Sequence, residues 1–206
     1  MLKNIVRPLL AWYEKNKRDL PWRREKNPYY IWVSEIMLQQ TRVEAVKPYF
    51  ERFIAKLPTV EALAACPEDG LLKLWEGLGY YNRVRNMQRA ARRVTEKYGG
   101  RLPADVKLLR ELPGIGEYTA GAIASIVWDI PVPAVDGNVL RIWARLTASR
   151  DDVLRQSVRR RAAGELAAVM PKKGSGELNQ AFMDLGSSVC VPGEQAGCDR
   201  CPLAFI

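Results

Sequence analysis

Apolar residues recur at the spacing of an α-helix along almost the whole chain, and this pattern limits the fold more than any other feature. Segments such as "RVEAVKPYFERFIAKL" place apolar side chains three and four positions apart, on one face of a helix. The most strand-like stretch, "IPVPAV", contains two prolines, which sheets tolerate only at edges and bulges, so it is predicted to be an extended loop. We therefore predict an all-α protein.

The charge balance narrows the class of partner. The 206 residues carry a formal net charge of +9, and the pI is about 9.5, which favours nucleic acid first and an acidic membrane surface second. Histidine is absent, which removes histidine-based metal sites, triads and general bases. The first apolar run is too short for a signal peptide and no segment is long enough to cross a membrane. We therefore expect the protein in the cytoplasm, or wherever the chromosome is.

The stretch "LPGIGEYTAGAIAS" predicts a helix-hairpin-helix. Gly114 and Gly116 stand in the turn, and the second helix is expected to begin near Glu117. Glycines permit positive φ angles and close approach of a phosphate, which the free N–H groups at the start of the second helix bind. The alternative is an ordinary helical hairpin with a glycine turn. The basic balance favours phosphate binding, and arginine-rich segments beside the aromatic "GLGYY" favour DNA in particular.

Two carboxylates stand in contrasting sequence surroundings. Glu35 lies in "VSEIMLQQT", an apolar run that predicts a buried helix, and desolvation there is expected to raise its pKa, as suits a general acid. The alternative is a structural glutamate paired with one of the chain's many arginines, such as Arg18, Arg23 or Arg24. Asp136, in "PAVDGNVLRIWARL", follows an extended loop that would bring it to a site, or it serves only as a helix N-cap.

Three cysteines crowd the C-terminal end. Their spacing, Cys190-x7-Cys198-x2-Cys201, indicates ligands of an iron–sulfur cluster or a zinc ion. A four-ligand site needs one more sulfur, and Cys66 is far away in the sequence. The alternative is three ordinary thiols without metal.

Taken together, these segments resemble the helix-hairpin-helix DNA glycosylase superfamily and, within it, the MutY-type adenine DNA glycosylases. The resemblance rests on strings that occur in the family's order: "RDLPWR", "VSEIMLQQTRV", "WEGLGYYNRVRN", "LPGIGEYTAGAI", "PAVDGNVLR", "NQAFMDLG" and the cysteine tail. It implies two helical lobes, with a six-helix barrel bearing the hairpin over 22–133. Residues 1–21 and 134–206 would form the second lobe, ending in a [4Fe–4S] loop.

The resemblance also implies the reaction and the roles of individual residues. Members remove adenine opposite 8-oxoguanine or guanine in double-stranded DNA, and we expect a monomer. Glu35 matches the catalytic acid, Asp136 the second carboxylate, and Asn138 a residue that supports the site. Bifunctional relatives have a strand-cutting lysine where this chain has Tyr118, which implies a monofunctional glycosylase. The remaining matches line the adenine pocket (Arg18, Trp22, Arg23, Gln180), enter the duplex (Gln40, Thr41, Tyr80) or clamp a phosphate (Gly114, Gly116).

This chain departs from the family pattern in two places. The first cysteine gap is seven residues where the family usually has six, and the fourth cysteine would fall just after Ile206. The cluster is therefore expected to be incomplete or absent unless the chain continues. The family's C-terminal domain, which helps to read 8-oxoguanine, has no counterpart here, so we expect weaker lesion discrimination.

The resulting hypothesis is hydrolysis of a flipped-out nucleotide. Adenine must leave the stack before a side chain reaches it, and the glycosidic bond then breaks toward an oxocarbenium ion. We predict that Glu35 protonates adenine at N7 and later assists water, while Asp136 stays ionised and stabilises the cation. One alternative is a thymine or pyrimidine mismatch glycosylase of the same superfamily. Another is a non-catalytic helix-hairpin-helix module that only binds DNA.

Overall fold

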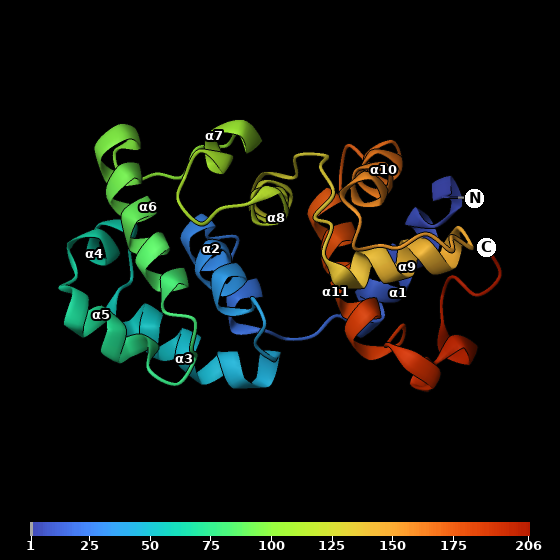
Figure 1. The fold of residues 1–206 in the computed structure, drawn as a ribbon, viewed down its shortest axis with the longest axis horizontal. Coiled ribbons are helices and arrows are strands. Elements are labelled where there is room, and N and C mark those ends of the chain that lie inside the picture. Colours follow the sequence, from blue (N-terminus) through green and yellow to red (C-terminus); the bar gives the residue numbers. More distant parts are fainter. Residues whose placement is uncertain (1) are drawn as a thin grey trace. The chain divides into compact units, whose positions relative to one another are not determined.

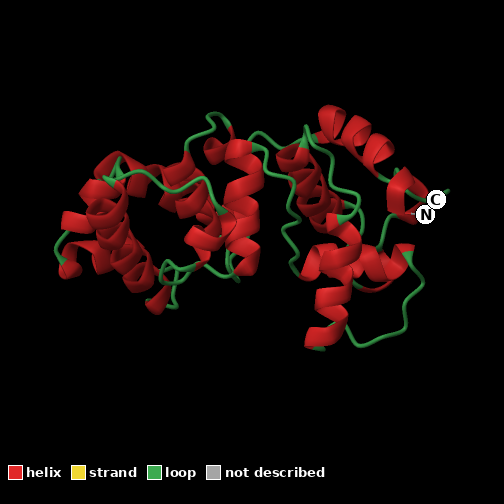
Figure 2. Ribbon diagram, turned by 90° about the horizontal axis from the view of Figure 1, so that it is seen from above, coloured by secondary structure: helices red, strands yellow, loops and turns green. Residues whose placement is uncertain are grey.

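The computed structural model describes residues 2–206, and within this range it contains helices and loops but no strand (Figure 2). This confirms the predicted all-α class. The chain divides into two compact units, each described here by itself. One unit is Asp19–Ile123, and the other joins the chain up to Arg18 with Ala124–Ile206. The resemblance predicts different lobes: one is 22–133, and the other joins 1–21 with 134–206. This division stays a prediction.

The Asp19–Ile123 unit is built around α2, which carries Glu35. Its helices are α2 (Pro28–Met37), α3 (Val43–Lys56), α4 (Val60–Ala65), α5 (Glu68–Trp75), α6 (Asn82–Tyr98), α7 (Val106–Arg110) and the first part of α8 (Glu117–Trp128). Helices α4 and α5 both pack on α6, as Figure 1 shows, and α2 packs on α3 and α6. The aromatic rings of Phe53 and Trp75 meet edge-on at 6.1 Å between centroids. The core therefore joins α3 to α5.

The other unit packs α1 (Val6–Asn16) and α9 (Gly137–Leu146) against α11 (Ser175–Ser188), with α10 (Gln156–Ala167) on α9. Its core consists of large apolar side chains from all four helices, among them Leu9, Trp143, Leu166 and Phe182. Three short 3-10 turns complete the unit: Leu2–Asn4, Gly193–Gln195 and Cys198–Arg200. A further 3-10 turn, Pro21–Arg23, belongs to the Asp19–Ile123 unit.

Helix ends follow their sequence signals, with one exception. Thr59 caps α4, where its hydroxyl accepts a hydrogen bond from the Ala62 N–H at 3.1 Å. Gly99 ends α6 in the left-handed conformation. The sequence pattern of 151–170 would allow a helix from Asp151 onward, but α10 begins only at Gln156. The Asp152 side chain accepts from the Leu154 N–H at 2.9 Å, and such local bonds compete with helix formation.

Candidate active site and DNA-binding elements

Glu35 lies on the inward face of α2, as predicted. The residue is only 4% exposed, among the buried side chains of Ile31, Trp32 and Ile36. Pro28 starts the helix, and the Asn27 side chain caps it by accepting from the Tyr29 N–H at 2.9 Å. The run folds into a buried helix because it offers apolar side chains on most faces. A carboxyl group is thereby held in a largely apolar environment.

Two of the three arginines considered as structural partners for Glu35 bind other carboxylates. The Arg18 Nε donates to Asp184 Oδ1 at 2.8 Å, and Asp184 is almost fully buried on α11. The exposed Arg24 pairs with Asp19 at 2.9 Å, which lowers the pKa of that aspartate. The resemblance implies that Arg18 and Arg23 line an adenine pocket, and these roles stay predictions.

Asp136 serves as the N-cap of α9 and also belongs to a hydrogen-bond network. Its Oδ1 accepts from the Val139 N–H at 2.8 Å, which confirms the capping interpretation. Its Oδ2 accepts from the Asn138 Nδ2 at 2.8 Å. Each carboxylate oxygen therefore has a hydrogen-bond donor. Capping does not exclude chemistry, because each oxygen retains accepting capacity.

Asn138 is held by contacts that the sequence did not reveal. Arg141, one turn further along α9, donates from Nη2 to the Asn138 Oδ1 and to the Gly186 carbonyl, both at 2.8 Å. Its Nε donates to the Cys190 carbonyl at 2.8 Å. A Cβ atom at Gly186 would lie 2.5 Å from the Asn138 Cβ, so only glycine fits. Helical spacing from Asn138 was the one available signal for Arg141.

A buried asparagine fixes the loop that leads to Asp136. The Asn179 Oδ1 accepts from the Ala134 N–H at 3.0 Å, and its Nδ2 donates to the Ser125 hydroxyl at 2.8 Å and to the Val132 carbonyl at 2.9 Å. Pairing with a side chain satisfies backbone groups that a strand would otherwise pair. The predicted extended loop is confirmed, and α11 holds it in place.

The predicted helix-hairpin-helix is present as α7, a tight turn and α8. Gly114 has φ +79°, and a Cβ there would lie 2.8 Å from the Asn86 Cβ on α6. Gly116 has no positive φ and no atom within 4 Å of an added Cβ, so the left-handed role predicted for both glycines applies to Gly114 alone. Space in front of Gly116 suits close approach by a ligand. Tyr118 follows in the first turn of α8, half-buried.

Residues matched to duplex entry and base binding lie on short connections, except Gln180, which lies on α11. Gln40 and Tyr80 are exposed, and both adopt left-handed φ angles, 58° and 50°. Thr41 follows Gln40 and donates from its hydroxyl to the Gln39 carbonyl at 3.3 Å. Trp22 is buried, and its ring lies edge-on to the ring of Phe50, with 5.3 Å between the ring centroids. Gln180 lies half-buried on α11.

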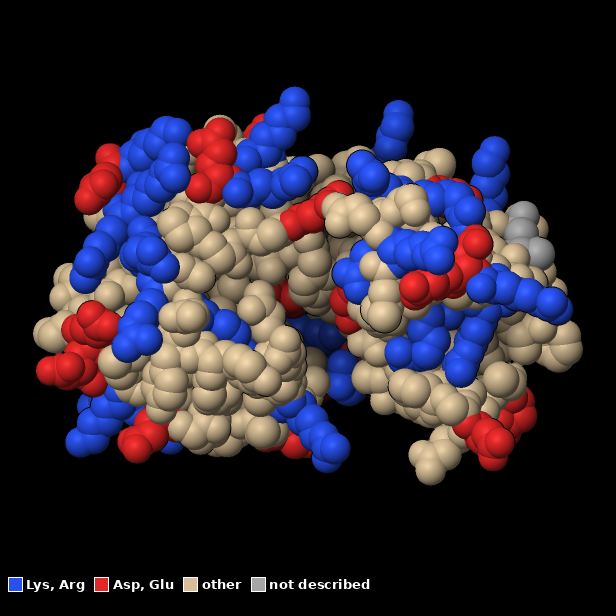
Figure 3. Space-filling model, viewed as in Figure 1, with Lys and Arg blue, Asp and Glu red and all other residues tan. Residues whose placement is uncertain are grey.

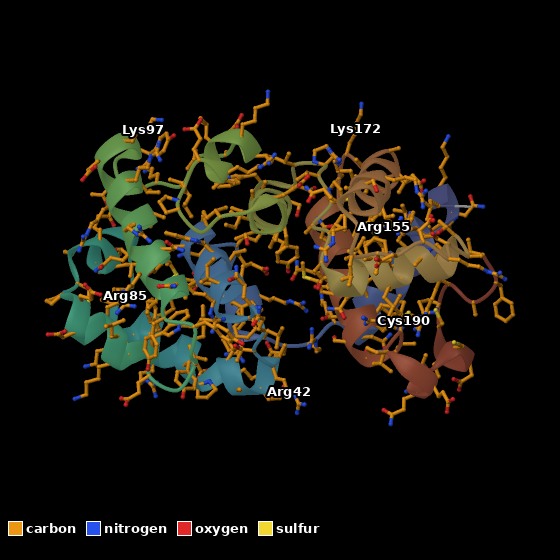
Figure 4. All side chains as sticks on the ribbon, in the orientation of Figure 1. Arg42, Arg85, Lys97, Arg155, Lys172 and Cys190 are labelled. Atoms are coloured by element: carbon orange, nitrogen blue, oxygen red, sulfur yellow. The ribbon has the colours of Figure 1, made fainter. Side chains whose placement is uncertain are left out.

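The three C-terminal cysteines are free thiols. Cys190 lies just past the end of α11 (Figure 4), and Arg145 donates to its sulfur at 3.0 Å. Burial raises the pKa of the Cys201 thiol. Within residues 2–206, no group of three or more Cys, Asp or Glu side chains gathers closely enough to hold a metal ion. Cys66 belongs to the other unit. Three thiols do not by themselves fit a four-ligand cluster.

Basic side chains gather over α6, at the left of Figure 3. Ion pairs neutralise part of this surface, since Arg85 binds Glu68 at 2.8 Å and Lys97 binds Glu111 at 3.4 Å. Figure 4 labels both cations.

No helix among residues 2–206 is long and apolar enough to cross a membrane.

The glycine turn between α7 and α8, in an all-helical chain, defines a helix-hairpin-helix protein. More narrowly, the chain belongs to the HhH-GPD superfamily of base excision DNA repair proteins, whose family model matches residues 33–167. It is 42% identical to an adenine DNA glycosylase of Rattus norvegicus, over 97% of this chain and 40% of the relative. It is 40% identical to one from Buchnera aphidicola, over 98% of this chain and 58% of that relative. The chain thus spans 40% and 58% of the length of these two relatives.

Solved structures share the fold. A thermostable thymine-DNA glycosylase superimposes with a TM-score of 0.87 at 26% identity, covering 98% of this chain and 92% of that one. An endonuclease III in a non-covalent complex with DNA gives a TM-score of 0.81 at 25% identity, covering 98% and 91%.

Proposed function

We propose that this chain hydrolyses the N-glycosidic bond of adenine in double-stranded DNA where adenine stands opposite 8-oxoguanine or guanine. The observation that carries this proposal is the 40–42% identity, over at least 96% of the chain, to relatives named adenine DNA glycosylase. The protein acts as a monomer in this proposal. The two-lobe division at 22–133, inferred from the resemblance, belongs to it as well.

Glu35 acts as the general acid. Its position on a buried, apolar stretch of α2 supports this role, because desolvation favours the protonated form of a carboxyl group. Adenine is a poor leaving group when it departs as an anion, and proton transfer to N7 lets it depart neutral. The carboxylate that results then assists the incoming water.

Asp136 acts as the electrostatic stabiliser. It receives hydrogen bonds from the Val139 N–H and the Asn138 amide, one on each carboxylate oxygen. A fixed negative charge stabilises the oxocarbenium ion that develops on the sugar as the base departs. Asn138 and, behind it, Arg141 hold this carboxylate in one orientation.

The other matched residues take supporting roles. Tyr118 has no amine and forms no Schiff base, so the enzyme is monofunctional. Gly114 and Gly116 bind a DNA phosphate at the hairpin. Gln40, Thr41 and Tyr80 enter the duplex. The remaining matched residues line the adenine pocket: Arg18, Trp22, Arg23 and Gln180.

For the cysteine loop we propose metal binding that needs a further ligand. Cys190, Cys198 and Cys201 supply three thiolates toward a [4Fe–4S] cluster or a zinc ion, and no catalytic step involves that metal. Elemental analysis of the purified protein tests this proposal, with iron and sulfide in a brown preparation or zinc in a colourless one expected. A metal-free protein with three alkylatable thiols in this loop contradicts it.

The decisive experiment incubates the protein with a duplex containing adenine opposite 8-oxoguanine and then adds alkali. Strand cleavage at the adenine only after alkali is the expected result, because hydrolysis leaves an alkali-sensitive abasic site. Borohydride should trap no covalent complex. A duplex with thymine opposite guanine tests the thymine-specific candidate, which the likeness to a thymine-DNA glycosylase structure favours. Binding without any abasic product would instead support the non-catalytic module.

A further inference from the structure

The side chain of Arg83 joins two separate segments of the Asp19–Ile123 unit. Arg83 stands in the first turn of α6 and donates only to backbone carbonyls. Its Nη1 binds the carbonyl oxygens of Ile36 at 3.0 Å, Met37 at 3.1 Å and Gln39. Its Nη2 binds those of Leu78 at 2.9 Å and Gly79 at 3.3 Å. One guanidinium group therefore holds the C-terminal end of α2 and the loop after α5.

Each of these segments ends at an exposed residue in a strained conformation. Gln40 directly follows Gln39, and Tyr80 directly follows Gly79; their φ angles are 58° and 50°. Left-handed backbone is disfavoured at a residue with a side chain and persists where surrounding contacts hold it. Tyr80 is 64% exposed, so its own packing does not supply those contacts. The fixed carbonyls on its N-terminal side do.

The surroundings of Arg83 are those of a positioning group. No carboxylate within residues 2–206 forms an ion pair with it, although it is half-buried. Burial lowers the pKa of its guanidinium. The group lies 5.4 Å from the ring centroids of both Trp75 and Tyr80. Trp75 in turn donates from its indole N–H to the Gly79 carbonyl at 3.0 Å.

We propose that Arg83 is a positioning residue that fixes the separation of Gln40 and Tyr80 before DNA binds. This rests on the proposed function, in which both residues enter the duplex. A planar guanidinium donates in several directions at once, whereas a lysine ammonium is a point donor that cannot span both segments. Because the backbone at Gln40 and Tyr80 is held before DNA binds, the cost of ordering these two residues does not weaken DNA binding. The side chains of Gln40 and Tyr80 are then already correctly placed when the adenine is displaced from the base stack.

The first test needs no substrate. Hydrogen exchange is followed by mass spectrometry in Arg83→Lys and in a matched control, Arg52→Lys, whose guanidinium also stacks on a tyrosine ring, at 4.6 Å. Reporter amides are those of Thr41 and Leu78, which donate to carbonyls within their own segments at 3.2 and 3.1 Å. We expect faster exchange over 38–41 and 77–81 in Arg83→Lys alone. Unchanged exchange there, or equal acceleration along the whole chain, would overturn the proposal.

The second test separates positioning from chemistry. Single-turnover adenine release is compared on a fully paired duplex and on one whose bases flanking the adenine are unpaired. Arg83→Lys should slow release by ~10- to ~100-fold on the paired duplex, the scale of a small misplacement. It should slow release far less on the unpaired one, where little displacement is needed. Equal losses on both would refute positioning. If the wild-type chain releases no adenine, the proposed function fails, and the exchange experiment still decides the role of Arg83.

Discussion

The surroundings of Glu35 and Asp136 differ in burial and in hydrogen bonding. Glu35 lies on α2 among aliphatic and aromatic side chains, where water is excluded. Asp136 lies half-buried at the start of α9, with a donor on each carboxylate oxygen. Burial among apolar side chains disfavours a charged carboxylate, whereas donors on both oxygens hold a carboxylate in place. The difference teaches that one residue class can occupy contrasting environments in one chain, and the proposed roles of acid and stabiliser rest on that contrast.

The largest expected effect comes from removing the proton of Glu35. Glu35→Gln keeps the shape of the side chain but cannot protonate adenine, so the single-turnover rate should fall by ~10²- to ~10⁴-fold, the range of general acid catalysis. Glu44→Gln, on the exposed face of α3, is the control and should retain the wild-type rate. A near-normal rate in Glu35→Gln would show that Glu35 is not the general acid.

The corresponding change at Asp136 should separate charge from capping. Asparagine is as good an N-cap as aspartate, so Asp136→Asn should keep the cap, and its stability should fall only through loss of the hydrogen bond from the Asn138 amide. Its rate should fall by ~10²- to ~10³-fold because the negative charge is lost. Asp136→Ala should lose the rate and also about 1 kcal/mol of stability, since the Val139 N–H loses its acceptor. Urea denaturation beside single-turnover assays checks both statements; full activity in Asp136→Asn would disprove the electrostatic role.

A smaller effect is expected at Arg141, which contacts Asn138 and reaches Asp136 only through it. Arg141→Met removes the donor to the Asn138 Oδ1, so the Asn138 amide is no longer held toward the carboxylate. The rate should fall by ~10- to ~100-fold through misplacement, with the affinity for DNA little changed. Arg159→Met, on exposed α10, is the comparison variant. Equal rates in the two variants would show that the network orders the fold without ordering Asp136.

The smallest effect tests how dry the environment of α2 is. Burial raises the pKa of Tyr29, whose hydroxyl donates to the Leu57 carbonyl at 2.9 Å. A raised pKa in the folded state means that stability is fully present below the ordinary tyrosine value of about 10 and is lost as pH rises past it. Urea denaturation across that pH range should show a steeper loss for wild type than for Tyr29→Phe. Parallel curves would indicate that water reaches the hydroxyl.

Local signals in the sequence predicted much of this architecture. Periodicity located the helices, and Thr59 and Gly99 marked helix ends through their own side-chain and backbone properties. The apolar neighbours of Glu35 are one turn away on the same helix, so its burial was predictable. Arg141 and Arg83 were missed because several of their partners lie more than forty residues away along the chain. Such contacts depend on how helices pack, which helical spacing does not encode.

The close approach of Gly186 to Asn138 has a consequence for reading sequence variants of this chain. Residue 186 has no ionisable or polar side chain, so a survey of functional groups would pass over it. Any side chain there would press on Asn138, and the disturbance would reach Asp136 through a single hydrogen bond. A substitution at this position should therefore resemble an active-site lesion in its phenotype. The absence of a side chain at residue 186, where α11 approaches α9, is therefore as informative about the proposed site as a charged group.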